Sequence, residues 1–146
     1  MSVSLSFDDF NGNLIDDVTV DYILGEIQRV VDGATVRRAG AIIGHEVKTE
    51  DGTSHIKTIN VEVHDELGCL LYYEQGSDEE CVSVGDESRL TERVVNGDGN
   101  YSGAGHYIDQ DAAIRAIKEF CRDGTADPTI QWMGAADLPA TRFWYS

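Results

Sequence analysis

HIKTINVEVHDELGCLLYYE, residues 55–74, holds two segments of β-strand character on either side of a short turn. In the first segment Ile59, Val61 and Val63 alternate with polar residues, which is typical of an antiparallel strand with one buried side and one wet side. DELG predicts a turn, and CLLYYE after it is apolar on both sides, as expected in the middle of a sheet. The stretch therefore predicts an antiparallel pair that includes the centre of a sheet.

Two segments outside this pair place apolar residues at helical spacing. Residues 17–32 form the first, with Thr19 among its possible N-caps and Gly33 suited to its end. The second begins after Asp109 as its cap and ends at Gly124. We expect both segments to be helices.

Several other segments have strand patterns, and the Asp51-Gly52 pair between two alternating runs is typical of a hairpin turn. The glycine-rich residues 96–105 predict a long loop. The additional strands are expected in residues 2–7, 37–47, 81–85 and 128–133. Consecutive strands with short turns predict an α+β fold, with a mainly antiparallel sheet of about five to six strands and two helices packed on it. We expect one domain over residues 1–146.

The charge balance of the chain is strongly acidic. Eleven Lys and Arg residues against twenty-seven Asp and Glu residues give 11 − 27 = −16, so the protein repels phosphate and attracts cationic surfaces. Direct binding of nucleic acid or of an anionic membrane is therefore disfavoured. No segment has the roughly 20 apolar residues of a membrane span, and the start MSVSLSFDDF lacks the pattern of a signal peptide. We expect a cytoplasmic protein.

The chain contains no recognisable catalytic or metal-binding motif. Its four histidines lack the H-E-x-x-H spacing, and its three cysteines lie far apart, as expected for buried thiols. The glycine-rich segment satisfies neither G-x-G-x-x-G nor the calcium-loop pattern. A small enzyme that uses scattered carboxylates is one alternative. We expect no enzyme activity, no cofactor and no metal.

Carboxylates gather in the segment that follows CLLYYE. From Glu74 to Asp98 there are eight acids and two bases, on what the pattern predicts to be exposed turns. Charge runs are often solvated faces, so one interpretation is an acidic, salt-adapted regulatory or binding domain. The other is a surface for a basic protein partner, because complementary potentials speed encounter and reject wrong partners.

From about Leu70 to Trp132 the chain resembles the immunity proteins of bacterial polymorphic toxin systems that neutralise deaminase-type toxins. The resemblance rests on LLYY before an acidic turn, the short strand CVSVGD, the segment GHYIDQDAAIRAIKEFC and the final IQW. It implies an α+β protein, a monomer or weak homodimer, that binds the basic cleft of one cognate toxin and blocks its active site. The identity of the toxin, and whether it acts on DNA, RNA or a nucleotide, stay open.

Under this interpretation, carboxylates of the acidic segment engage Lys and Arg residues around the toxin's cleft. Tyr101 and His106, on or next to the glycine-rich loop, are expected to supply an apolar anchor. Tyr73 and Trp132 are expected in the core. The expected partner-binding residues are Glu74, Asp78, Glu79, Glu80, Asp86, Glu87, Asp98, Tyr101 and His106.

Overall fold

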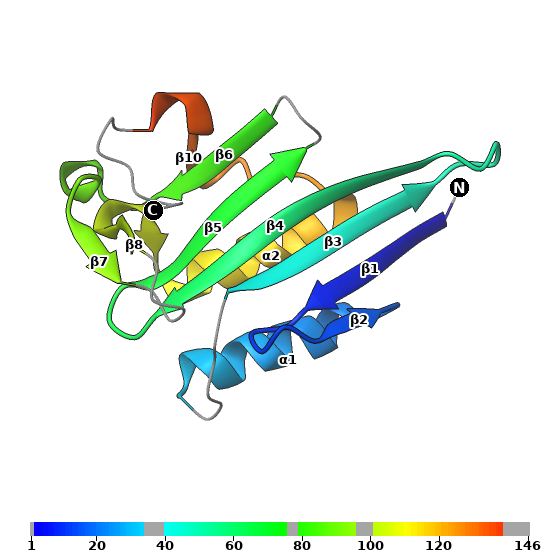
Figure 1. Cartoon of the computed structure of the whole chain (residues 1–146), viewed down its shortest axis with the longest axis horizontal. Coiled ribbons are helices and arrows are strands. Elements are labelled where there is room, and N and C mark those ends of the chain that lie inside the picture. The colour runs from blue at the N-terminus through cyan, green and yellow to red at the C-terminus, as the bar shows by residue number, and fades with distance from the viewer. Residues whose placement is uncertain (1, 34–39, 76–78, 96–100, 139–146) are drawn as a thin grey trace.

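A computed structural model describes residues 2–33, 40–75, 79–95 and 101–138. Its main feature is an eight-stranded antiparallel sheet (Figure 1). The strands lie in the order β10-β6-β5-β4-β3-β1-β2, and β9 pairs with β5 beside this row. The strand bounds are β1 Ser2–Asp8, β2 Leu14–Asp16, β3 Ala41–Lys48, β4 Ser54–His64, β5 Gly68–Gln75, β6 Glu79–Val84, β9 Tyr107–Ile108 and β10 Gln131–Gly134.

The predicted strand pair is β4 and β5, which run antiparallel from the Lys57–Gln75 pair to the His64–Gly68 pair. The predicted hairpin turn joins β3 to β4, with Gly52 in a left-handed conformation at φ 88°. The α+β class is confirmed. The sheet has more strands than the expected five to six, because β2 and β9 contain only three and two residues and such short segments show no alternation.

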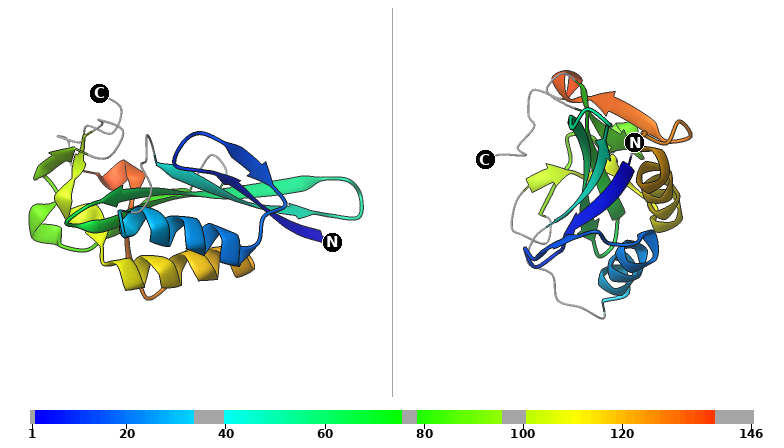
Figure 2. Two further views of the ribbon diagram at one scale, coloured as in Figure 1. Left: turned by 90° about the horizontal axis from the view of Figure 1, so that it is seen from below. Right: turned by 90° about the vertical axis from the view of Figure 1, so that its right-hand side faces the viewer.

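Both helices lie on one face of the sheet (Figure 2). Helix α1 (Val20–Val31) begins after Thr19, and α2 (Gln110–Asp123) begins after Asp109 and ends at Gly124, which is left-handed at φ 71°. No helix in the described ranges is long and apolar enough to cross a bilayer. The main core lies between helices and sheet, and its largest fully buried side chains include Phe7, Ile23, Ile27, Ile43, Ile59, Leu71, Ile117 and Phe120.

A second, smaller apolar cluster lies on the other face of the sheet. Leu70, Tyr72, Val82 and Tyr107 form it, with Val94 packed against them. Tyr72 and Tyr107 are 8% and 5% exposed. At this end of the sheet, the side chains on the helix-free face are therefore packed together and buried.

The glycine-rich segment is only partly a loop. Strand β8 (Tyr101–Gly103) pairs with β7 (Arg93–Val95), whereas residues 96–100 lie outside the described ranges. The Gly85 N–H donates to the Gly105 carbonyl at 2.8 Å, and a Cβ atom at Gly105 would lie 2.1 Å from the Asp86 carbonyl oxygen. The expectation of one long loop is thus wrong for its second half, where glycine permits close backbone packing.

The aromatic residues and cysteines occupy packed positions. Tyr73 is 4% exposed and belongs to the main core, and Trp132 is half-buried with its ring centroid 6.3 Å from that of Tyr73. Cys69 and Cys121 are buried, and Cys81 is half-buried. Burial raises the pKa of Cys121 to about 11, which makes its thiolate a poor candidate nucleophile at neutral pH.

Candidate interaction surface

The acidic segment begins with two carboxylates that face each other across neighbouring strands. Glu74 of β5 is the cross-strand partner of Glu80 in β6. The Tyr72 hydroxyl donates to Glu80 Oε2 at 2.8 Å. Burial raises the pKa of Glu74, and the negative charge of Glu80 raises it further. A cation placed over this pair would therefore stabilise both charged carboxylates, because it would offset the repulsion between them.

Asp86 and Glu87 lie beyond the opposite end of β6, at the short helix η1 (Glu87–Arg89). The Ser88 hydroxyl and backbone N–H donate to Asp86 Oδ1 at 2.6 and 3.0 Å, and these hydrogen bonds lower the pKa of Asp86. The side chain of Gln131 donates to Glu87 Oε1. Both exposed carboxylates thus already take part in local structure, at the other end of a strand from Glu80.

His106 does not lie on the surface. It is 1% exposed, and its Nδ1–H donates to the Ser83 carbonyl at 2.9 Å. The Ser83 hydroxyl in turn donates to the His106 carbonyl at 2.8 Å. The expected anchor role of His106 is therefore corrected, because its ring joins η2 (Ala104–His106) to β6 inside the protein.

The remaining predicted contacts are only partly located. Glu79 begins β6, where its Cα is paired with Gln75, and Tyr101 begins β8 opposite Val95. Asp78 and Asp98 lie outside the described residues. Of the nine predicted residues, the structure thus brings Glu74 and Glu80 together as a pair.

The strand side chains that point away from the helices form a second group of polar residues. In β3, Ile43 is buried toward the helices, so Ile42 and Glu46 point the other way. We call this helix-free surface the open face. Its charged residues are Asp8, Asp16, Glu46, Lys48, Glu62, Glu74 and Glu80, and its exposed apolar residues are Leu14, Ile42 and Ile56.

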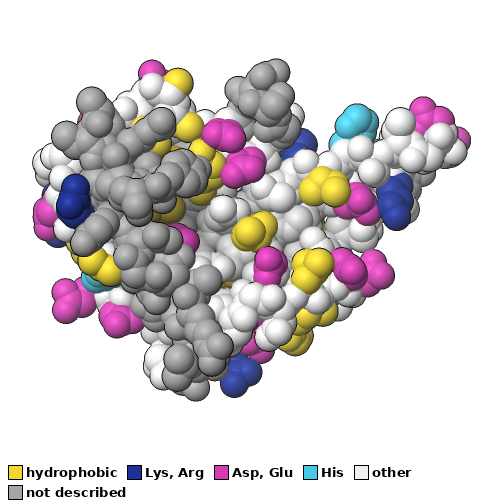
Figure 3. All heavy atoms as spheres, in the orientation of Figure 1, with side chains coloured by type: hydrophobic (Ala, Val, Ile, Leu, Met, Phe, Trp, Pro, Cys, Tyr) yellow, Lys and Arg dark blue, Asp and Glu magenta, His cyan; other side chains and the backbone are white. Residues whose placement is uncertain are grey.

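The open face is strongly negative. Among its described residues, six carboxylates and one lysine give 1 − 6 = −5. Lys48 Nζ lies 3.6 Å from Glu46 Oε1, so this lysine is itself near a carboxylate. Figure 3 shows acidic side chains distributed around apolar ones on this face. The negative charge thus extends well beyond the predicted acidic segment.

Sequence reasoning missed four of these carboxylates, namely Asp8, Asp16, Glu46 and Glu62. They belong to four different strands. Asp8 and Asp16 lie in an acidic stretch near residues 8–21, but Glu46 and Glu62 stand alone on the polar side of alternating segments. Strand pairing brings these four residues onto one surface.

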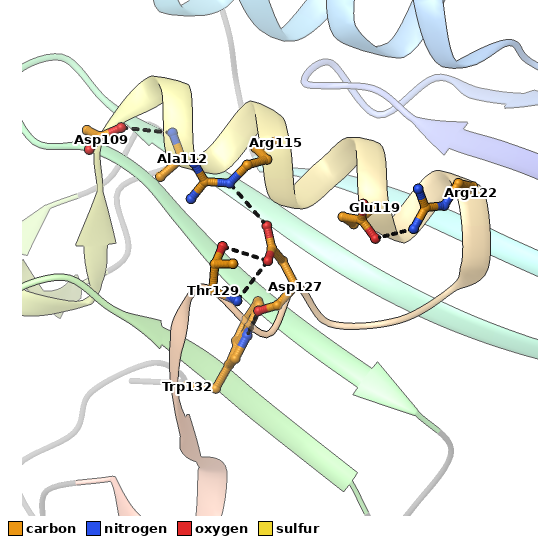
Figure 4. Close-up of polar contacts among 8 residues, drawn as sticks. All are labelled: Asp109, Ala112, Arg115, Glu119, Arg122, Asp127, Thr129 and Trp132. Carbon is orange, nitrogen blue, oxygen red and sulfur yellow. Dashed lines mark hydrogen bonds and ion pairs between the residues drawn. The ribbon is translucent and has the colours of Figure 1, made fainter.

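Helix α2, on the opposite side of the sheet, has no net charge. It carries three acidic and three basic residues, 3 − 3 = 0. Two of its bases have acidic partners: Arg115 Nε donates to Asp127 Oδ2 at 3.4 Å, and Arg122 lies 2.6 Å from Glu119 Oε2 (Figure 4). The open face is therefore more negative than this helix.

A shallow depression of about 370 Å³ lies on the open face at β1–β4. Ile56 of β4 borders the depression and is 55% exposed. Ile42 of β3 lies farther from it and is 38% exposed. Ser6 lines the depression, and its Oγ lies over Gly44, 2.5 Å from where a Cβ at Gly44 would be. The surface thus combines apolar side chains, carboxylates and a hollow.

These features provide a surface for binding. Among the described residues, no group of three His, Cys, Asp or Glu side chains is placed to hold a metal ion. The buried His106 has its pKa lowered by burial, although the hydrogen bond to Ser83 opposes this shift, and it lies away from the carboxylates of the open face. A negative face with exposed isoleucines offers contacts for a cationic protein surface.

A family model described as "Immunity protein Imm1" matches residues 19–134. The chain belongs to the Imm1 immunity protein family. The range matched to Imm1 runs from the N-cap of α1 to the last residue of β10, so β1 and β2 with Asp8 and Asp16 lie outside it. Imm1 membership confirms the resemblance to immunity proteins and implies a cognate toxin protein as partner. No curated protein matches the chain.

Proposed function

We propose that this Imm1 protein inhibits a cognate toxin of the nucleic-acid deaminase type, or another toxin that acts on nucleic acid, by covering its active site in the cytoplasm. The observation that supports the target class is the open face, with a charge of −5 among its described residues. An enzyme that holds nucleic acid needs Lys and Arg residues around its cleft. A surface rich in carboxylates is complementary to such a cleft.

The proposed mechanism is occlusion, and the Imm1 protein makes and breaks no bond. A deaminase must bring a single base into its active-site pocket while the neighbouring phosphates lie on basic side chains. Carboxylates of the Imm1 protein occupy the places of those phosphates, so substrate and inhibitor exclude each other. Glu74 and Glu80 are the predicted contacts that fit this mechanism best, because they lie side by side in neighbouring strands. Asp78, Glu79, Asp86, Glu87, Asp98 and Tyr101 stay predicted contacts.

The test is competition between the Imm1 protein and nucleic acid for the toxin. The reading frame immediately upstream should encode the toxin, and its C-terminal domain can be purified in a catalytically inactive form. We expect the Imm1 protein to displace a fluorescent oligonucleotide from this domain, and its co-expression to rescue cells from the active toxin. Binding without displacement would contradict occlusion, and absence of any binding would contradict the whole proposal.

The alternative of an acidic, salt-adapted binding domain is favoured only by the formal net charge of −16. It predicts folding that depends on molar salt, because screening would have to offset the repulsion between carboxylates. The immunity proposal predicts a folded protein at about 0.1 M salt, where screening already acts beyond about 10 Å. Urea titrations at low and high KCl separate the two.

A further inference from the structure

We propose that the open face is the toxin-binding surface, with Ile42 and Ile56 as apolar anchors inside a ring of carboxylates. This inference rests on the proposed function and assigns its contact surface. The partner surface it fits is basic, with Lys or Arg side chains around an apolar patch. Such a combination is common in protein interfaces, where a few well-packed side chains carry most of the energy.

Strand register places a carboxylate beside each anchor. Ile42 is the cross-strand partner of Asp8, and Ile56 is that of Glu46. A partner arginine or lysine can therefore lay its apolar stem along an isoleucine while its charged group meets the neighbouring carboxylate. Asp8 Oδ1 is buried and accepts no hydrogen bond from the described residues, so a cation against the exposed part of this half-buried carboxylate would stabilise its charge.

The shape of the open face supports the same occupant. The depression beside Ile56 has a volume of about 370 Å³, and its lining holds three acids, Asp16, Asp17 and Glu46, against one base, Lys48. An extended cationic side chain of a partner would fill this hollow better than a flat apolar surface would. The exposed carboxylates at its rim would orient that side chain before contact.

Glu74 and Glu80 extend the negative surface toward β6. Two cross-strand carboxylates repel each other in the free protein, and a cation over them offsets this repulsion on binding. A typical interface takes about 800 Å² from each partner, roughly a tenth of the 7872 Å² accessible surface of this chain. A sheet face of several strands can supply such an area.

Two double variants test the assignment against the inactive upstream-encoded toxin domain. Ile42→Ala/Ile56→Ala should weaken affinity by about 10- to 100-fold, mainly through faster dissociation. Glu74→Gln/Glu80→Gln should slow association by about 3- to 10-fold at low salt, with the effect fading as salt screens the charges. Binding kinetics at several salt concentrations measure both effects.

The controls change matched residues away from the open face. Val3→Ala truncates a side chain of the same sheet that is 51% exposed and points to the opposite side. Asp111→Asn/Glu119→Gln removes two negative charges from α2. Both controls should bind the toxin domain with unchanged affinity and association rate.

Three outcomes separate this inference from the proposed function. Losses confined to the open-face variants, with circular dichroism like that of the unmodified protein, support the inference. Unmodified protein that binds and inhibits the toxin, together with open-face variants that bind equally well, would overturn the assignment and leave the immunity function intact. Unmodified protein that fails to bind the toxin domain at all would overturn both.

Discussion

Replacing Asp127 by alanine should lower the free energy of unfolding by about 3 kcal/mol. Asp127 follows α2 in the turn before β10 and is only 3% exposed. Its Oδ1 accepts from the Thr129 N–H at 2.9 Å and from the Thr129 hydroxyl at 2.7 Å. Its backbone carbonyl accepts from Trp132 Nε1 at 2.9 Å, so the same residue fixes the edge strand (Figure 4).

The magnitude follows from these contacts. A hydrogen bond to a charged acceptor contributes about 1.5–3 kcal/mol, and the two bonds from Thr129 are counted at the low end because Thr129 is exposed. The ion pair with Arg115 adds less than about 1 kcal/mol, because that side chain is 57% exposed. For a chain of this size, 3 kcal/mol corresponds to roughly 6–12 °C in melting temperature.

Urea titration followed by circular dichroism measures the loss, with Asp127→Asn and Arg115→Ala as controls. Asparagine keeps an acceptor for Thr129, so Asp127→Asn should cost about half as much, and Arg115→Ala should cost under about 1 kcal/mol. Burial opposes ionisation of Asp127, but the hydrogen bonds outweigh it and lower its pKa below 3.8. Its ionic contribution is therefore present above pH 3.8 and lost as the pH falls through the lower folded pKa.

An Asp127→Ala variant that loses less than about 1 kcal/mol at pH 7 would contradict the stabilising role of the Thr129 hydrogen bonds. A loss as large for Arg115→Ala as for Asp127→Ala would also contradict it, because the ion pair and not the turn would then be decisive. Equal losses for alanine and asparagine would show that charge outweighs hydrogen-bond geometry at this position.

Three further predictions concern other parts of the fold. Burial lowers the pKa of His106 below its ordinary value of 6.5. The contribution of the neutral ring to stability should therefore be full above about pH 6.5 and fall as the pH drops toward the folded pKa. Urea titrations at pH 5.5 and 7.5 should show a smaller difference in unfolding free energy for His106→Asn than for the unmodified protein. Gly85→Ala should lower stability by about 2 kcal/mol or more, since its Cβ would lie 2.1 Å from the Tyr107 carbonyl oxygen. Gly25→Ala on α1 meets open space and should raise stability by about 0.5–1 kcal/mol. Thermal melts of the two variants should therefore shift in opposite directions. Glu80→Gln should lower the pKa of Glu74 only part of the way to its ordinary value, because burial is the larger cause of the shift, and an NMR titration that finds no change would contradict the assigned repulsion.

The helices and main strands were predictable because each carries its own local signal. Residues 17–32 repeat at helical spacing, and the structure gives Val20–Val31. The strands at residues 55–74 alternate or are wholly apolar, and they form β4 and β5. Short strands such as β2 and β9 escaped prediction, because their pairing depends on partners elsewhere in the chain and their few residues form no pattern.

Candidate site residues divide in the same way. The negative charge of Glu74 and Glu80 was visible as part of a run, whereas the burial of His106 was hidden because it depends on β6 and η2 closing around the ring. A glycine-rich flank suggested an exposed histidine. Close backbone contact through those glycines instead buries it.

By itself the sequence determined the fold class, the excess of carboxylates and the resemblance to immunity proteins, because composition, local periodicity and motif order are properties of the chain. Which carboxylates share a surface depended on the tertiary structure. Antiparallel register aligns single carboxylates from β1, β2, β3, β4, β5 and β6 on one face, while α2 balances its own charges on the other side. A surface made from one residue per strand has no signature along the chain, since its members become neighbours only when the strands pair.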